Sequence, residues 1–122
     1  MKKITLQLTV SEFLSLHQFC QNTFFYKENT SLDLVSDSQM IISDYFITLH
    51  SRIDIWKSKP TSKPHKLEIP LTIGRIIAKE LIHSRLGFDL QSILGKMDKE
   101  LVNNNFNLSK YIQDGTQNQV FC

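Results

Sequence analysis

The chain has 122 residues, of which 41% are hydrophobic and 21% are charged. This length and composition predict one globular domain that buries a core without disulfides, and they exclude a collagen-like or disordered chain. The formal net charge is only +2, so charge alone does not indicate a nucleic-acid partner.

The cysteines and the hydropathy pattern predict a cytoplasmic location. Cys20 and Cys122 lie far apart and form no CxxC pair, which favours reduced thiols over a disulfide framework or a zinc site. Residues 4–10 alternate apolar and polar side chains, whereas a secretion signal needs an unbroken apolar run. No stretch approaches 18 apolar residues, so we expect no membrane span. The Asn- and Lys-rich usage points to a bacterial or phage source.

Hydrophobic periodicity in the first half predicts one strand followed by two helices. Ser11 follows the period-two alternation and has the side chain of a helix N-cap. A later apolar stripe, from Ile42 to Trp56, follows Asp37 or Ser38 as its candidate cap. The expected elements are a strand over residues 3–10, a helix to about residue 25, a loop over 26–36 and a helix over 37–56.

The second half repeats this order after a linker. Residues 57–65 hold two prolines and no apolar side chain, which is typical of an exposed connector. In the strand that follows, Pro70 cannot donate to a neighbouring strand. Thr72 is the candidate cap of the next helix, and Gly87 fits the C-cap position after it. The expected elements are a strand over 67–71, a helix from residue 72 and a helix from residue 89 to the asparagines at 103–105.

This order predicts an α+β fold that is mostly helical, with a short two-stranded antiparallel ribbon packed on about four helices. We expect a single domain over residues 1–113 and a flexible tail over 114–122. A shift of 63 positions aligns the apolar patterns of 3–56 and 66–105, which suggests an internal repeat joined by the basic linker 57–65. Any strand that runs into a helix shares part of this pattern, so a coincidental likeness is the other interpretation.

No motif in the sequence identifies a reaction. His17 and Cys20 lie three residues apart on one expected helix, a spacing that two ligands of one metal can use. Cys20 also fits the apolar stripe of that helix, and the other histidines stand at no ligand spacing, so a structural role is favoured. Carboxylates fall mostly on polar helix faces, and phosphate-loop, zinc-protease and hydrolase motifs are absent. We therefore expect no catalytic residue, no metal and no cofactor.

The pattern favours a small cytoplasmic interaction or regulatory module without catalytic activity. The first two helices carry more aromatic surface than a core obviously needs, and Tyr45 and Trp56 are the candidate interface residues. The expected partner is another protein or a second copy of the chain in a homodimer. The other interpretation of these aromatic side chains is that they fill the core.

A DNA-binding regulator is the alternative function. The strand–helix–helix unit is similar to half of a ribbon–helix–helix protein, in which outward strand side chains read the major groove. That resemblance implies base contacts for Thr5, Gln7 and Thr9, while Glu68 and Pro70 depart from it. The last two helices also resemble a helix-turn-helix pair. Its candidate contacts are Gln91, Ser92 and Lys96, and the lysines available to phosphates are Lys57, Lys59, Lys63 and Lys66.

Overall fold

The computed structural model describes residues 2–104, apart from the side chain of Leu32. Its elements are β1 (Lys3–Leu8), α1 (Val10–Glu28), the 3-10 helix η1 (Leu32–Leu34), α2 (Asp37–His50), α3 (Ile53–Lys57), β2 (His65–Pro70), α4 (Leu71–Ile82) and α5 (Phe88–Asn103). The predicted α+β, mostly helical fold with a two-stranded antiparallel sheet is confirmed over this range. The predicted domain end at residue 113 and the tail over 114–122 lie outside the described residues.

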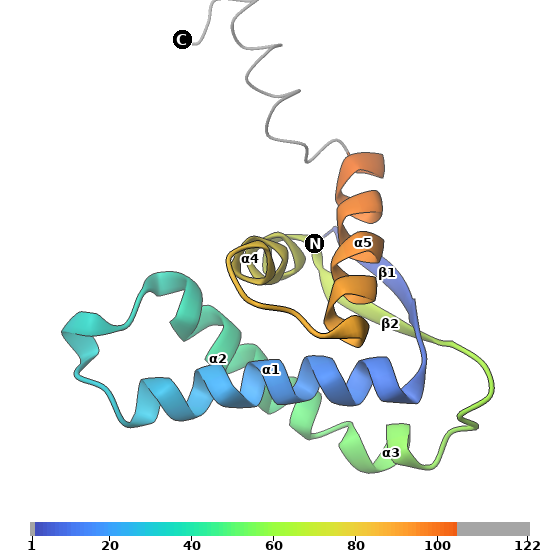
Figure 1. Ribbon diagram of the computed structural model, residues 1–122, viewed down its shortest axis with the longest axis horizontal. Helices are drawn as coiled ribbons and strands as arrows, with labels where there is room; N and C mark the ends of the chain where they lie inside the picture. The colour runs from blue at the N-terminus through green and yellow to red at the C-terminus, as the bar shows by residue number, and fades with distance from the viewer. Residues whose placement is uncertain (1, 105–122) are drawn as a thin grey trace, which may run out of the picture.

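The two strands form an antiparallel ribbon with one face on the core. Ile4 pairs with Ile69 and Leu6 pairs with Leu67, and all four side chains are buried. Because side chains alternate across a strand, the intervening residues lie on the opposite face, which is exposed or half-buried. Figure 1 shows α5 crossing in front of the ribbon, with α4 and α1 beside it. This packing matters because a two-stranded ribbon is only marginally stable by itself.

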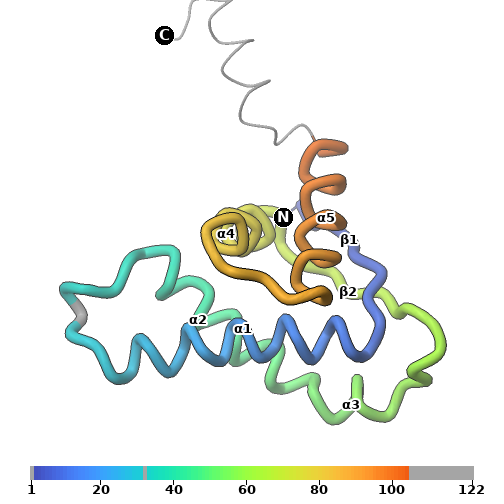
Figure 2. Tube along the Cα trace, viewed as in Figure 1, coloured from blue at the N-terminus to red at the C-terminus, as the bar shows by residue number. Residues whose placement is uncertain are grey.

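The helices α1 and α2 form an antiparallel hairpin, which Figure 2 shows as two long neighbouring runs of the trace. The helix predicted to continue through Trp56 is broken, since α2 ends at His50 and α3 begins at Ile53. Beyond the break, Trp56 stacks on Phe13 of α1, with ring centroids 4.3 Å apart and planes within 4°. No Pro or Gly marks the break in the sequence, so the periodic stripe alone could not reveal it.

Both long helices of the first half begin with a capping box that the sequence analysis missed. The Thr9 hydroxyl accepts from the N–H of Glu12, whose carboxylate accepts from the N–H of Thr9. Ser36 and Gln39 form the same reciprocal pair at the start of α2. Each box satisfies two backbone donors that the helix leaves free. The caps predicted from the sequence, which are Ser11 and Asp37 or Ser38, are therefore wrong by one or two residues.

Helix α4 starts directly at the end of β2, with no side-chain cap at Pro70. It packs closely on the ribbon at Gly74, where an added Cβ would lie 2.6 Å from Cδ1 of Ile4. The predicted cap Thr72 is an exposed residue of the first turn. The prediction that Gly87 is the C-cap of α4 is wrong. Helix α4 ends five residues earlier, and Gly87 instead precedes α5.

Candidate functional site

A polar network joins β1, α1 and α5 around Glu12, a residue that is only 6% exposed. The carboxylate accepts from Ser92 Oγ at 2.6 Å, from Lys96 Nζ at 2.8 Å and from the Thr9 N–H at 2.9 Å. Burial raises the pKa of Glu12, but these hydrogen bonds and the Lys96 charge outweigh it and hold the pKa below its usual range. A carboxylate with this many donors stabilises the fold and is a poor general base.

The network engages three of the residues predicted to contact DNA. The Thr9 hydroxyl caps α1, and the polar groups of Ser92 and Lys96 bind the buried carboxylate. Lys96 also donates to the backbone carbonyl of Gln7 at 2.8 Å. Because Glu12 needs these donors to stay charged while buried, this fold does not leave them free for DNA. Of the predicted helix-turn-helix contacts, only Gln91 remains exposed without a charged partner in the described chain.

The outward face of the ribbon keeps its predicted residues at the surface. Gln7 is exposed and lies opposite Lys66, and Thr5 is half-buried and lies opposite Glu68. The side chains of Lys66 and Glu68 pair at 3.5 Å, and both are largely exposed. The remaining lysines of the predicted phosphate-contacting set precede β2 and are exposed or half-buried: Lys57, Lys59 and Lys63.

The interface predicted at Tyr45 and Trp56 is not at the surface. Tyr45 is 5% exposed and Trp56 is 3% exposed, and both belong to the hydrophobic core. Burial raises the pKa of Tyr45 to about 12, against an opposing effect of Arg52. The Tyr45 hydroxyl has no hydrogen-bond partner within residues 2–104. The prediction is therefore corrected: Tyr45 on α2 and Trp56 on α3 both lie in the core, where the Trp56 ring stacks on Phe13 of α1.

His17 has a partner that sequence spacing did not reveal. Its Nε2 lies 3.1 Å from Nδ1 of His50 on the facing helix α2, and the two rings are stacked within 21°. Burial lowers the pKa of His17, and the charges of His50 and Lys57 lower it further. The neutral form of His17 is thus favoured, and the pair is an imidazole–imidazole hydrogen bond that only the tertiary fold creates.

This pair does not extend to a metal centre in the described part of the chain, which contains no group of three or more His, Cys, Asp or Glu residues able to hold a metal. Cys20, the predicted companion of His17, is fully buried, and burial raises its pKa to about 12. Such a thiol is neither a good ligand nor a nucleophile at neutral pH. The structural role favoured for Cys20 matches its place in the core.

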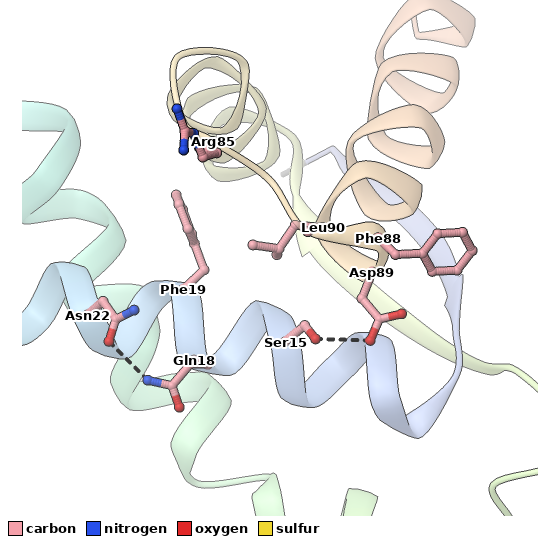
Figure 3. Close-up of a pocket in the computed structure, with 9 residues that line it drawn as sticks. Ser15, Gln18, Phe19, Asn22, Arg85, Phe88, Asp89 and Leu90 are labelled. Carbon is pink, nitrogen blue, oxygen red and sulfur yellow. Dashed lines mark hydrogen bonds between the residues drawn. The ribbon is translucent and has the colours of Figure 1, made fainter.

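A groove of about 460 Å³ lies between α1 and the start of α5. In Figure 3, Phe19 and Leu90 point into the space between the helices, and Arg85 lies above them in the loop between α4 and α5. Phe88 projects away on the other side of Asp89 and is 86% exposed. Aromatic side chains are enriched at protein interfaces, so Phe88 is a candidate contact beside the groove.

The polar groups of the groove are unevenly paired. The Asp89 carboxylate accepts from Ser11 Oγ at 2.6 Å and from Ser15 Oγ at 3.1 Å. The amides of Gln18 and Asn22 bond to each other at 2.9 Å. The sequence predicts Ser11 and residue 89 only as starts of helices and gives no signal for a groove, because the serines and Asp89 lie 78 and 74 positions apart.

No protein-family model, no curated protein and no solved structure matches this chain. Within residues 2–104, every helix is too short or too polar to cross a membrane. Any functional inference therefore depends on the groove, the ribbon face and the buried polar groups described above.

Proposed function

We propose that this protein is a small, non-catalytic cytoplasmic interaction module that binds a peptide segment of a protein partner in the groove between α1 and α5. The observation that carries the proposal is the pairing of an open, partly apolar groove with an almost fully exposed aromatic residue, Phe88, at its edge. Exposed aromatic side chains beside a concave surface are typical of recognition sites.

The charges of the groove define the chemistry of the bound segment. Asp89 is engaged by two serine hydroxyls, whereas Arg85 makes no ion pair or hydrogen bond with any residue of the described range. Phe19 and Leu90 are half-buried and leave apolar surface inside the groove. A segment with an apolar anchor next to an Asp or Glu side chain would therefore fill the groove and pair with Arg85.

Selection from a random-peptide phage library tests this specificity. We expect the selected peptides to share an aromatic or aliphatic residue beside an acidic one. A labelled consensus peptide should bind in fluorescence anisotropy, and Arg85→Glu should weaken it about tenfold through charge repulsion. Phe88→Ser should also weaken binding, and neither change removes a buried side chain.

The matched control is Lys79→Glu, which makes the same change of charge on an exposed position of α4. Equal affinity of the wild type, Arg85→Glu and Lys79→Glu for the selected peptides would overturn the proposed site. Light scattering of the protein without peptide tests whether it forms the homodimer predicted from the sequence. If the protein is a dimer that Phe88→Ser converts to a monomer, the occupant is a second copy and the peptide proposal is wrong.

A further inference from the structure

The outward face of the ribbon is a second exposed surface that the groove does not use. Its strand positions are Lys3, Thr5 and Gln7 on β1, facing Pro70, Glu68 and Lys66 on β2. The opposite face is fixed in the core by Ile4, Leu6, Leu8, Leu67 and Ile69. A slip of one residue would expose this apolar set, so the outward side chains are held in one register.

A basic segment leads into this surface and is tied to one end of the ribbon. Residues 57–66 contain four lysines and no carboxylate. His65 Nε2 lies 2.7 Å from the carbonyl oxygen of Pro60, and the His65 ring meets Trp56 edge-on at 5.9 Å. The ammonium group of Lys59 lies 5.6 Å from the centroid of the Trp56 ring. These contacts fold the segment beside the start of β2 and concentrate positive charge there.

We infer that the ribbon face and this basic segment form a binding site for duplex DNA. The major groove admits a two-stranded antiparallel ribbon, and the lysines of residues 57–66 supply the complementary charge for phosphates. Gln7 and Thr5 carry the hydrogen-bonding groups that can read base edges. The face has one carboxylate, Glu68, whose charge is partly offset by Lys66 at 3.5 Å.

The site is smaller than the one the sequence suggested. Thr9 and Lys96 are excluded by their bonds to Glu12, while Thr5 and Gln7 remain on the outward face. The inference does not rest on the groove between α1 and α5, which involves different side chains.

Binding of a labelled duplex of more than two helical turns, measured by fluorescence anisotropy at several salt concentrations, tests the inference. Four phosphate contacts predict a slope of about −3.6 in log affinity against log salt, which is about a hundredfold loss between about 50 and about 200 mM. Lys63→Gln with Lys66→Gln should reduce the slope by about two. Both lysines are exposed, so the double variant should fold, and circular dichroism confirms this.

The matched control is Lys79→Gln with Arg85→Gln, which removes two charges at exposed positions outside the ribbon and the basic segment. This control should keep the wild-type salt slope for DNA, while the Arg85 change should lower the affinity for the peptide that binds in the groove. The failure of one proposal is therefore distinguishable from the failure of the other. Equal slopes for both double variants would overturn the DNA site.

Two single changes sharpen the assignment of the ribbon face. Glu68→Gln should tighten DNA binding about threefold, because it removes a negative charge from the face that approaches the negatively charged duplex. Gln7→Ala should alter the preference among duplexes of different sequence without changing the salt slope, because base contacts carry specificity and phosphate contacts carry affinity. Binding to anionic phosphatidylserine vesicles that is as strong as binding to the duplex, and equally sensitive to the lysine changes, would overturn the inference.

Discussion

The two strand–helix–helix halves of this protein share an order of elements but differ in how they are stabilised. The first half buries the polar side chains of Glu12, His17 and Ser43. Within the described residues of the second half, the buried side chains are all apolar, and α4 meets the ribbon through Gly74. The buried polar side chains therefore lie in the first half, although Glu12 takes two of its donors from Ser92 and Lys96 of the second half.

The difference shows why a similar apolar pattern does not establish a repeat. At the first strand–helix junction, Thr9 and Glu12 satisfy each other's backbone donors, whereas Pro70 offers no side-chain cap at the second. The alignment of the halves detects the strand and helix periods but not these partners. The internal repeat of 3–56 and 66–105 stays a prediction, and the following changes break or sharpen the contrast between the halves.

The largest effect is expected at Glu12. Glu12→Ala removes the side-chain half of the capping box, takes away the acceptor of Ser92 and leaves Lys96 with only the Gln7 carbonyl, so the free energy of unfolding should fall by about 2 kcal/mol in chemical denaturation. Glu28→Ala is the matched control, because Glu28 is exposed and makes only a 3.7 Å ion pair with its neighbour Lys27. The control should change stability by less than about 0.5 kcal/mol. Equal losses for the two variants would contradict the structural role of the network.

The stability of the second half should be sensitive to added side-chain volume where α4 meets β1. Gly74→Ala improves helix propensity, but its methyl group meets Cδ1 of Ile4, and the net loss should be about 1 kcal/mol. Ile4→Val removes that Cδ1 atom and should cost about 1 kcal/mol by itself. The double variant should lose clearly less than the sum of the two single losses. Additive losses would show that the close approach of α4 and β1 is not what limits this position.

Removing a polar atom from the first half should stabilise it. The buried Tyr45 hydroxyl lacks a partner in the described range, so Tyr45→Phe should raise the free energy of unfolding by about 1 kcal/mol. Phe46→Tyr offers the converse test, since it introduces a hydroxyl at another buried ring of α2 and should destabilise the fold. A loss of stability in Tyr45→Phe would contradict the view that this hydroxyl is buried without a partner among the described residues.

The smallest effect is a pH dependence of stability that arises from His17 in the first half. The pKa of His17 is lowered in the folded state, so the unfolded chain binds more protons just below its ordinary pKa of about 6.5. The contribution of neutral His17 to the free energy of unfolding is therefore complete above the unfolded-state pKa. It is lost as the pH falls from there through the lower pKa of the folded state. Denaturation midpoints measured between about pH 7 and pH 5 should fall less in His17→Gln than in the wild type. The pKa of Glu12 is also lowered, which places its own loss at more acidic pH.

The candidate surfaces were predictable to different degrees. Gln7 and the lysines of residues 57–66 follow directly from strand alternation and local charge, and the fold keeps them available. The burial of Tyr45 was not predictable, because the sequence pattern of an aromatic residue on a helix is the same whether a neighbouring helix or solvent covers it. The groove required knowing that the start of α5 lies against α1, which no local pattern encodes.

The sequence by itself determined the class of fold, because periods of two and of about 3.6 residues are properties of the backbone that apolar side chains follow locally. It also determined that the ribbon has one apolar and one polar face. Only the tertiary structure decided which polar groups are used inside the molecule, such as Ser92 and Lys96 on Glu12 and His50 on His17. Those partners lie 33 to 84 positions apart, and hydrogen bonds over such separations depend on packing geometry that residue spacing does not contain.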